Sequence, residues 1–176
     1  MKFRFALILI AMPFLLLAQK PKKREGLPST PEELEKLYKS NIRKSRIKGV
    51  YIPKDLNDAL LQLEKLSDKE GLLKFKLAPE ENIDRKLHFG LGRWMIYNWN
   101  FYYGSRLEHY LKQMGLMHPD DMADFLIISF HRYLNKKPLN SKELIQKFRK
   151  KRWEKLNKKF KRDTVIVKKK PKDSGQ

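Results

Sequence analysis

Apolar residues recur every three or four positions along most of this chain, the spacing of one face of an α-helix. The clearest stretch carries Leu56, Ala59, Leu60, Leu63 and Leu66. Further helices are expected over 30–48, with Thr30 as N-cap, and over 67–75, with Ser67 as N-cap. Others are expected from 79 into the segment 87–107, and over 105–114, 119–135 and 140–163. Residues 50–53 are expected to be extended, because Pro53 disfavours helix at the residue before it. Residues 164–167 form a short β-prone run. The pattern predicts an all-α fold.

One helix is expected to lie at the centre of this fold. Apolar side chains cover most of the circumference of 119–135: Met122, Phe125, Leu126, Ile127, Ile128 and Phe130. A helix that is apolar nearly all round is a buried one. His118-Pro119-Asp120-Asp121 places proline at the first helical position and acids in the first turn, both typical of a helix start. We therefore expect a compact multi-helix domain with a buried central helix over about 119–135.

The last predicted helix is long and basic. Residues 141–163 carry eleven Lys and Arg against three acids. The large apolar residues fall in one sector: Ile145, Phe148, Trp153, Leu156 and Phe160. Two interpretations stay open. The apolar sector either docks on the domain, or makes peripheral contact with an anionic membrane surface, with the cations over the lipid head groups.

The N-terminus has the pattern of a secretory signal peptide over residues 1–18. Lys2 and Arg4 precede an apolar run, 5–18, that is shorter than the roughly 20 residues of a membrane span. The alternative is an uncleaved N-terminal anchor. No cysteine is present anywhere, so a lipid-modified N-terminal cysteine and disulfides are both excluded. The protein is expected to be exported, either to the periplasm or to the extracellular medium.

The net charge of +20 resides in the flanks of the chain. Residues 19–48 hold ten Lys and Arg against four acids, 136–172 hold seventeen against three, and 49–135 hold eleven against twelve. Four parts follow: a signal peptide (1–18), a basic linker with a weakly docked helix (19–49), a neutral helical domain (50–137), and a basic amphipathic helix with a disordered tail (138–176). Because the domain is neutral and exported proteins seldom meet nucleic acid, nucleic acid is not the expected partner.

Aromatic and polar side chains concentrate in residues 88–107, which hold two Trp, three Tyr and two Phe. This number exceeds what one buried face of a small domain requires, and such side chains with arginine often anchor recognition surfaces. We predict a binding module that recognises a protein or a small anionic ligand through this segment. Together with two residues of the central helix, the candidate ligand-binding residues are His88, Arg93, Trp94, Asn98, Trp99, Ser105, Arg106, His131 and Arg132.

Three arginines could form an anion site. Arg93, Arg106 and Arg132 could converge, with Arg106 at a predicted helix start whose free N–H groups attract phosphate or carboxylate. The alternative is that they pair with the acids of 120–124 inside the domain.

A second functional hypothesis is a hydrolase or metal-dependent enzyme that uses His88, His131 and Asp120, since imidazole and carboxylate groups bind zinc. It predicts that these side chains share one pocket. No two histidines have the i, i+4 spacing of a helical chelate, and Ser105 lacks the context of a nucleophilic serine. We therefore assign no catalytic residue, metal ligand or cofactor.

Six short motifs lie in order through the neutral domain. They are I-P-K-D-L at 52–56, H-F-G-L-G-x-W at 88–94, N-W at 98–99, G-S-R-L at 104–107, H-P-D-D-M at 118–122 and H-R-Y-L-N at 131–135. On these motifs the chain resembles a family of small bacterial helical domains of unknown function. The resemblance spans about residues 50–137 and covers neither basic flank. It implies a compact helical domain and brings no activity.

Overall fold

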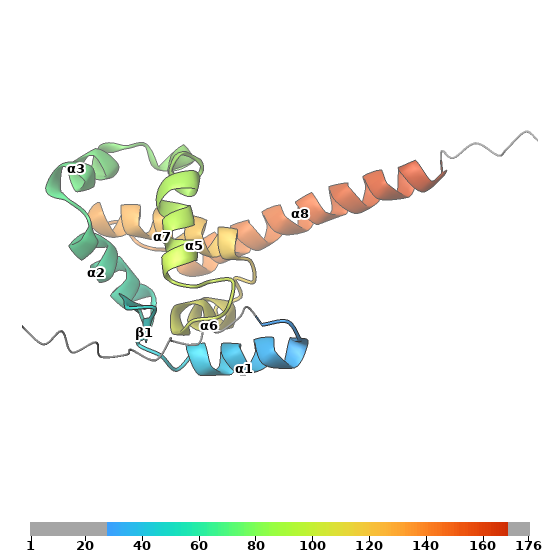
Figure 1. Ribbon diagram of the computed structural model, residues 1–176. Coiled ribbons are helices and arrows are strands. Elements are labelled where there is room, and N and C mark those ends of the chain that lie inside the picture. Colours follow the sequence, from blue (N-terminus) through green and yellow to red (C-terminus); the bar gives the residue numbers. More distant parts are fainter. Residues whose placement is uncertain (1–27, 169–176) are drawn as a thin grey trace, which may run out of the picture.

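The computed structural model describes residues 28–168, and Figure 1 shows them as a body of helices from which one long helix projects. The strands in this part of the chain form a single two-stranded antiparallel sheet. The predicted all-α class and the compact multi-helix domain are confirmed. The predicted signal peptide (1–18) and the end of the predicted tail (169–176) lie outside the described residues.

The first helix, α1 (Pro31–Asn41), begins where the sequence predicts and ends earlier. Thr30 is its N-cap, and its Oγ1 accepts a hydrogen bond from the backbone N–H of Glu33 (3.2 Å). The predicted continuation to residue 48 is wrong, because β1 (Arg46–Ile47) and β2 (Val50–Tyr51) form an antiparallel hairpin there.

A two-residue turn closes this hairpin. Lys48 (φ 49) and Gly49 (φ 83) both adopt positive φ and join the paired residues Ile47 and Val50. Two consecutive positive φ angles match the twist of a hairpin, and glycine adopts one without strain. The turn sets Ile47 and Val50 against the hydrophobic core, half-buried.

The next two helices are α2 (Leu56–Leu66) and α3 (Lys69–Leu77). The predicted cap of α3 at Ser67 is wrong by one residue. Asp68 is the cap, and its Oδ1 accepts from the N–H of Gly71 (2.7 Å), whereas the Ser67 hydroxyl donates to Leu63 O at the end of α2 (2.8 Å). The carboxylate also carries the negative charge that a helix N-terminus favours.

Four short elements follow one another without a break: η1 (Glu80–Asn82), α4 (Ile83–Leu87), the π-helical turn η2 (His88–Gly92) and α5 (Arg93–Asn98). Of these, α4, η2 and α5 pack on the central helix α7 (Pro119–Leu134). A Cβ at Gly92 would lie 3.5 Å from Ile127 Cδ1 and 3.7 Å from Ala123 Cβ. These are ordinary van der Waals distances, so η2 packs directly on α7 without leaving a gap at Gly92.

The central helix has the position that its sequence predicts. α7 contacts α2, α3, α4, α5, α6 (Arg106–Gln113) and the C-terminal helix α8 (Ser141–Lys168). Its buried residues are Met122, Ala123, Phe125, Leu126, Ile127, Ile128, Ser129, Phe130 and His131. His118 is the N-cap, and its Nδ1 accepts from the N–H of Asp120 (3.2 Å).

The helix α8 has a docked part and a projecting part. Leu144, Ile145 and Phe148 are buried in the body, whereas the helix beyond them leaves it (Figure 1). The backbone over 164–167, which the sequence suggested as β-prone, continues this helix to residue 168. No helix between residues 28 and 168 is long and apolar enough to cross a membrane.

Candidate functional site

The aromatic segment 88–107 is divided between the core and the surface. Trp99 and Phe101 are 0% and 2% exposed, so the predicted site residue Trp99 belongs to the core. The exposed members are Trp94 (37%), Tyr97 (79%), Tyr102 (65%) and Tyr103 (36%). Trp94 contacts Trp99 edge-on, with ring centroids 5.7 Å apart.

Ser105 and Arg106, two further predicted site residues, have structural contacts. Ser105 is fully buried and caps α6 by accepting from the N–H of Glu108 (3.2 Å). Arg106 Nε donates to Ile52 O (2.7 Å), and its guanidinium lies over the ring of Tyr51, 5.1 Å from the centroid. Arg106 thereby holds the chain directly after the hairpin onto α6.

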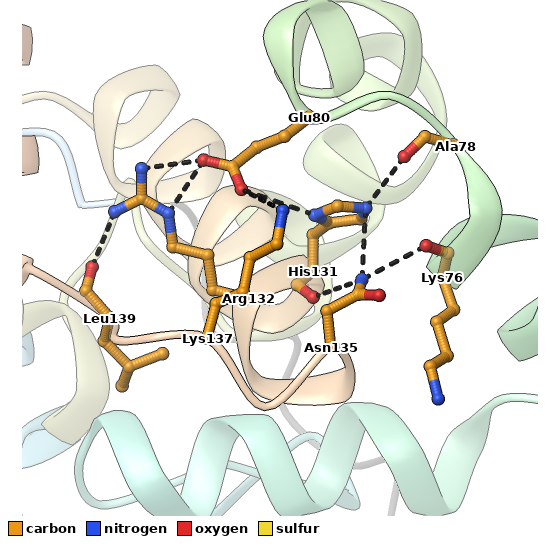
Figure 2. A network of polar contacts seen from close by, with 8 residues as sticks. All are labelled: Lys76, Ala78, Glu80, His131, Arg132, Asn135, Lys137 and Leu139. Atoms are coloured by element: carbon orange, nitrogen blue, oxygen red, sulfur yellow. Dashed lines mark hydrogen bonds and ion pairs between the residues drawn. The ribbon is translucent and has the colours of Figure 1, made fainter.

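Arg132 belongs to a polar network at the C-terminal end of α7, shown in Figure 2. Its Nε and Nη2 lie 2.8 and 2.7 Å from Oε1 of Glu80, and its Nη1 donates to Leu139 O (2.8 Å). Burial alone would raise the pKa of Glu80, but the hydrogen bond and charge of Arg132, with Lys137 and His131, hold that pKa below its usual value. The network joins η1 to the loop between α7 and α8.

His131 lies in the same network (Figure 2) and is only 2% exposed. Its Nε2 donates to Ala78 O (2.9 Å), and its Nδ1 lies 3.7 Å from Oε2 of Glu80. Asn135 Nδ2 donates to the backbone oxygens of His131 (2.9 Å) and Lys76 (3.1 Å). These contacts connect the end of α3 to α7.

The three arginines of the predicted anion site lie apart from one another. Arg106 contacts Ile52 and Tyr51, Arg132 contacts Glu80, and Arg93 is exposed on α5. The alternative, pairing with the acids of 120–124, is also not what the structure shows for Arg106 and Arg132. Helical spacing places a side chain on a face, but long-range packing decides which loop or helix that face meets.

His88 lies at a cavity of about 270 Å³ between η2, the start of α7 and α8. Its Nδ1 is 2.7 Å from Oδ1 of Asp124, and its Nε2 is 3.9 Å from Oδ1 of Asp120. Burial raises the pKa of Asp124, although the contact with His88 opposes that shift. Arg152 crosses from α8 and binds both carboxylate oxygens of Asp121 (2.8 and 2.7 Å).

The three residues of the enzyme hypothesis do not share this cavity. His88 and Asp120 line it, whereas His131 lies in the network of Figure 2, near the other end of α7. Between residues 28 and 168, no group of three or more His, Asp and Glu side chains is arranged to hold a metal ion. The geometry gives the enzyme hypothesis no assembled site.

The exposed aromatic residues line a different hollow, between the hairpin and α5. It consists of two cavities of about 580 and 240 Å³ that share Val50 and Asn98 as lining residues. We call this hollow the aromatic groove. Trp94 lines the larger cavity with residues of the hairpin and α2, and Tyr97, Tyr102 and Tyr103 line the smaller one.

Three basic side chains of the aromatic groove are exposed: Arg46, Lys48 and Lys65. Its one acid, Asp58, already accepts hydrogen bonds from the hydroxyl of Tyr51 and the backbone N–H of Lys54, both at 2.8 Å. The groove therefore presents aromatic surface bordered by positive charge.

Two of the nine predicted site residues, Trp94 and Asn98, line the aromatic groove. Sequence reasoning missed the hairpin, because 46–48 was expected to end a helix although 50–53 was expected to be extended. The signal was present in Lys48-Gly49, a two-residue turn that ends in glycine and lies between the β-branched residues Ile47 and Val50. Sequence reasoning also did not name Tyr97, Tyr102 and Tyr103 as individual site residues, because only the packing of the folded chain decides that they are exposed and Trp99 is buried.

Residues 52–134 match the model of a family described as a domain of unknown function (DUF6794). No curated protein and no solved structure matches the chain. The match lies within the predicted domain of 50–137 and supports an uncharacterised domain family there. It includes α5 and its aromatic residues, whereas the hairpin and α8 lie outside it.

Proposed function

We propose that this chain is an exported binding module and that it recognises an acidic segment of a partner protein in the aromatic groove. The observation that carries the proposal is the grouping of four exposed aromatic side chains, Trp94, Tyr97, Tyr102 and Tyr103, in one basic-rimmed hollow. Exposed aromatic rings supply large, rigid contact area at a low cost in conformational entropy, as in binding surfaces generally.

The groove is supported from below by the core, which favours binding with little rearrangement. Trp94 rests against the buried Trp99, and the buried Ile96 lines the smaller cavity. The backbone at Tyr103, which lines the smaller cavity, is held by Asn41: Nδ2 of Asn41 donates a hydrogen bond to Tyr103 O (3.2 Å). When the binding surface is already ordered in the free protein, little conformational entropy is lost when a ligand binds.

Charge decides the class of ligand that we propose. Arg46, Lys48 and Lys65 attract an acidic partner and accelerate its approach. A small anion would instead require several donors at one point, and Arg93, Arg106 and Arg132 are dispersed. An extended acidic segment can meet the separate cations while its apolar residues contact the rings.

The test selects ligands and then asks where they bind. Displayed random peptides are selected on immobilised protein lacking residues 1–18, and the affinity of enriched peptides is measured by fluorescence anisotropy. Removing two exposed rings, Tyr97→Ala with Tyr102→Ala, should weaken binding at least about tenfold, since each such ring contributes on the order of 1 kcal/mol or more. Both rings are mostly solvent-exposed, so the fold should be retained.

The matched control is Phe89→Ala. Phe89 is an aromatic residue of similar exposure (76%, against 79% for Tyr97 and 65% for Tyr102) at the His88 cavity, outside the aromatic groove. It should leave peptide affinity unchanged. Failure to enrich acidic peptides, or equal binding by the wild type and the Tyr97/Tyr102 variant, would refute the proposal.

A further inference from the structure

The helix α8 changes its environment at Arg152. Before this residue, Leu144, Ile145 and Phe148 are buried against the body. Arg152 itself is fixed by its two contacts with the Asp121 carboxylate on α7. Beyond it, the helix runs out from the body, as Figure 1 shows in orange to red. We call residues 153–162 the projecting segment.

Large apolar side chains are exposed along one side of the projecting segment. Trp153, Leu156 and Phe160 are 65%, 44% and 69% exposed. Their i, i+3, i+7 spacing places them within about 60° of arc, because successive helical residues are about 100° apart. The docked part of α8 has its own buried apolar face, so this exposed stripe is not required to attach the helix.

Cations occupy the rest of the circumference. The projecting segment contains Lys155, Lys158, Lys159, Lys161 and Arg162, against the single acid Glu154. At 100° per residue, these five lie between about 80° and 240° from Trp153, opposite the apolar stripe. An apolar stripe with basic residues around it is the pattern of a helix that lies in the interface of a membrane.

We propose that the projecting segment is a peripheral membrane anchor that lies on an anionic lipid surface, with Trp153, Leu156 and Phe160 inserted among the lipids. Nucleic acid would neutralise the cations but leave these three apolar side chains in water. A second copy packed on the apolar stripe would bury these three side chains but leave the five cations of each copy facing water. An anionic bilayer accommodates both faces of the segment at once.

The projecting segment and the aromatic groove lie on opposite sides of the protein body. The hairpin β1–β2, which forms one side of the aromatic groove, lies across the body from the projecting segment (Figure 1). A protein held by residues 153–162 therefore keeps its groove away from the lipid. This proposal does not depend on what the groove binds.

The test measures co-sedimentation of the chain lacking residues 1–18 with two kinds of vesicle, phosphatidylcholine alone and phosphatidylcholine with phosphatidylglycerol. The wild type should bind the anionic vesicles at least tenfold more tightly, and the difference should shrink as salt screens the cations. The variant Trp153→Ala/Leu156→Ala/Phe160→Ala should lose at least tenfold in affinity. Because the three side chains are exposed, its thermal unfolding should remain close to that of the wild type.

Two controls separate the proposal from its rivals. Leu73→Ala with Leu77→Ala removes apolar side chains that are 57% and 75% exposed on α3, and should leave vesicle binding unchanged. Quenching of tryptophan fluorescence by brominated lipid should decrease strongly in Trp153→Phe while binding persists.

Three results would overturn the proposal. Undiminished vesicle binding by the triple apolar variant would show that charge alone attracts the helix. Absence of vesicle binding together with tight binding to duplex DNA would identify a nucleic-acid segment. Concentration-dependent dimerisation abolished by the triple variant, without vesicle binding, would identify an interface between copies.

Discussion

Replacing Gly104 with alanine should detach α1 from the body. Gly104 has φ +82, a conformation that strains any residue with a Cβ. An added Cβ would also lie 2.2 Å from Cδ2 of Tyr38 on α1, a distance at which the ring must move. Tyr38 is the docking side chain of this helix: its hydroxyl lies 3.1 Å from Nδ1 of His109, and Lys112 Nζ lies over its ring at 4.9 Å.

The magnitude follows from these contacts. Left-handed backbone in alanine costs about 1–2 kcal/mol. Loss of the Tyr38 hydrogen bond adds about 0.5–1.5 kcal/mol, and loss of the cation–π contact about 0.5–1 kcal/mol. We expect Gly104→Ala to lower the free energy of unfolding by about 2–4.5 kcal/mol, measured by urea denaturation.

Gly49→Ala provides the matched control. Gly49 has nearly the same φ (+83) and nothing within 4 Å of its added Cβ, so only the backbone cost of about 1–2 kcal/mol applies. Tyr38→Ala should remove the clash, so Gly104→Ala should cost less in that background than in the wild type. Equal destabilisation by Gly104→Ala and Gly49→Ala would refute the proposed docking of α1 through Tyr38.

Three further predictions concern the network, the titration of Tyr38 and the N-terminus. Arg132→Ala removes the contacts with Glu80 and Leu139 O, and should lower the free energy of unfolding by about 2–3 kcal/mol in urea denaturation; an unchanged value would contradict the network's structural role. Burial and the nearby Glu108 raise the pKa of Tyr38 to about 12, so the folded state keeps a proton that the unfolded state, with a tyrosine pKa near 10, loses. The free energy of unfolding should therefore fall as pH rises from about 10 to 12, and that of the Tyr38→Phe variant should fall less steeply over this range. Parallel curves of the free energy of unfolding against pH for the two proteins would contradict this. N-terminal sequencing of protein recovered outside the cytoplasm should begin near Gln19, and an intact N-terminus at Met1 would contradict cleavage of the signal peptide.

The features that sequence predicts correctly are those with long, repeated signals. The central helix was predictable because apolar residues occupy almost its whole circumference over four turns, and only burial accommodates that pattern. The hairpin pairs two residues with two, too few for alternation to reveal it. The cap at Thr30 predicts where α1 begins but contains no information about its end.

The candidate site was predictable as a segment but not as a set of side chains. Composition indicates that 88–107 holds more aromatic residues than a core face needs, yet Trp99 is buried while Tyr97, two positions earlier, is 79% exposed. That division depends on which side of α5 meets α7. Likewise, the partner of Arg132 is Glu80, 52 positions away, which no local pattern could indicate.

The central claim, that the aromatic groove is the binding site, is tested most directly by hydrogen exchange of the protein with and without a peptide selected on it. Binding should slow amide exchange in 46–51 and 94–103, on both sides of the groove, and leave 85–89 and 151–155 at the His88 cavity unchanged. Slowed exchange at the His88 cavity, with none at the hairpin and α5, would contradict the assignment.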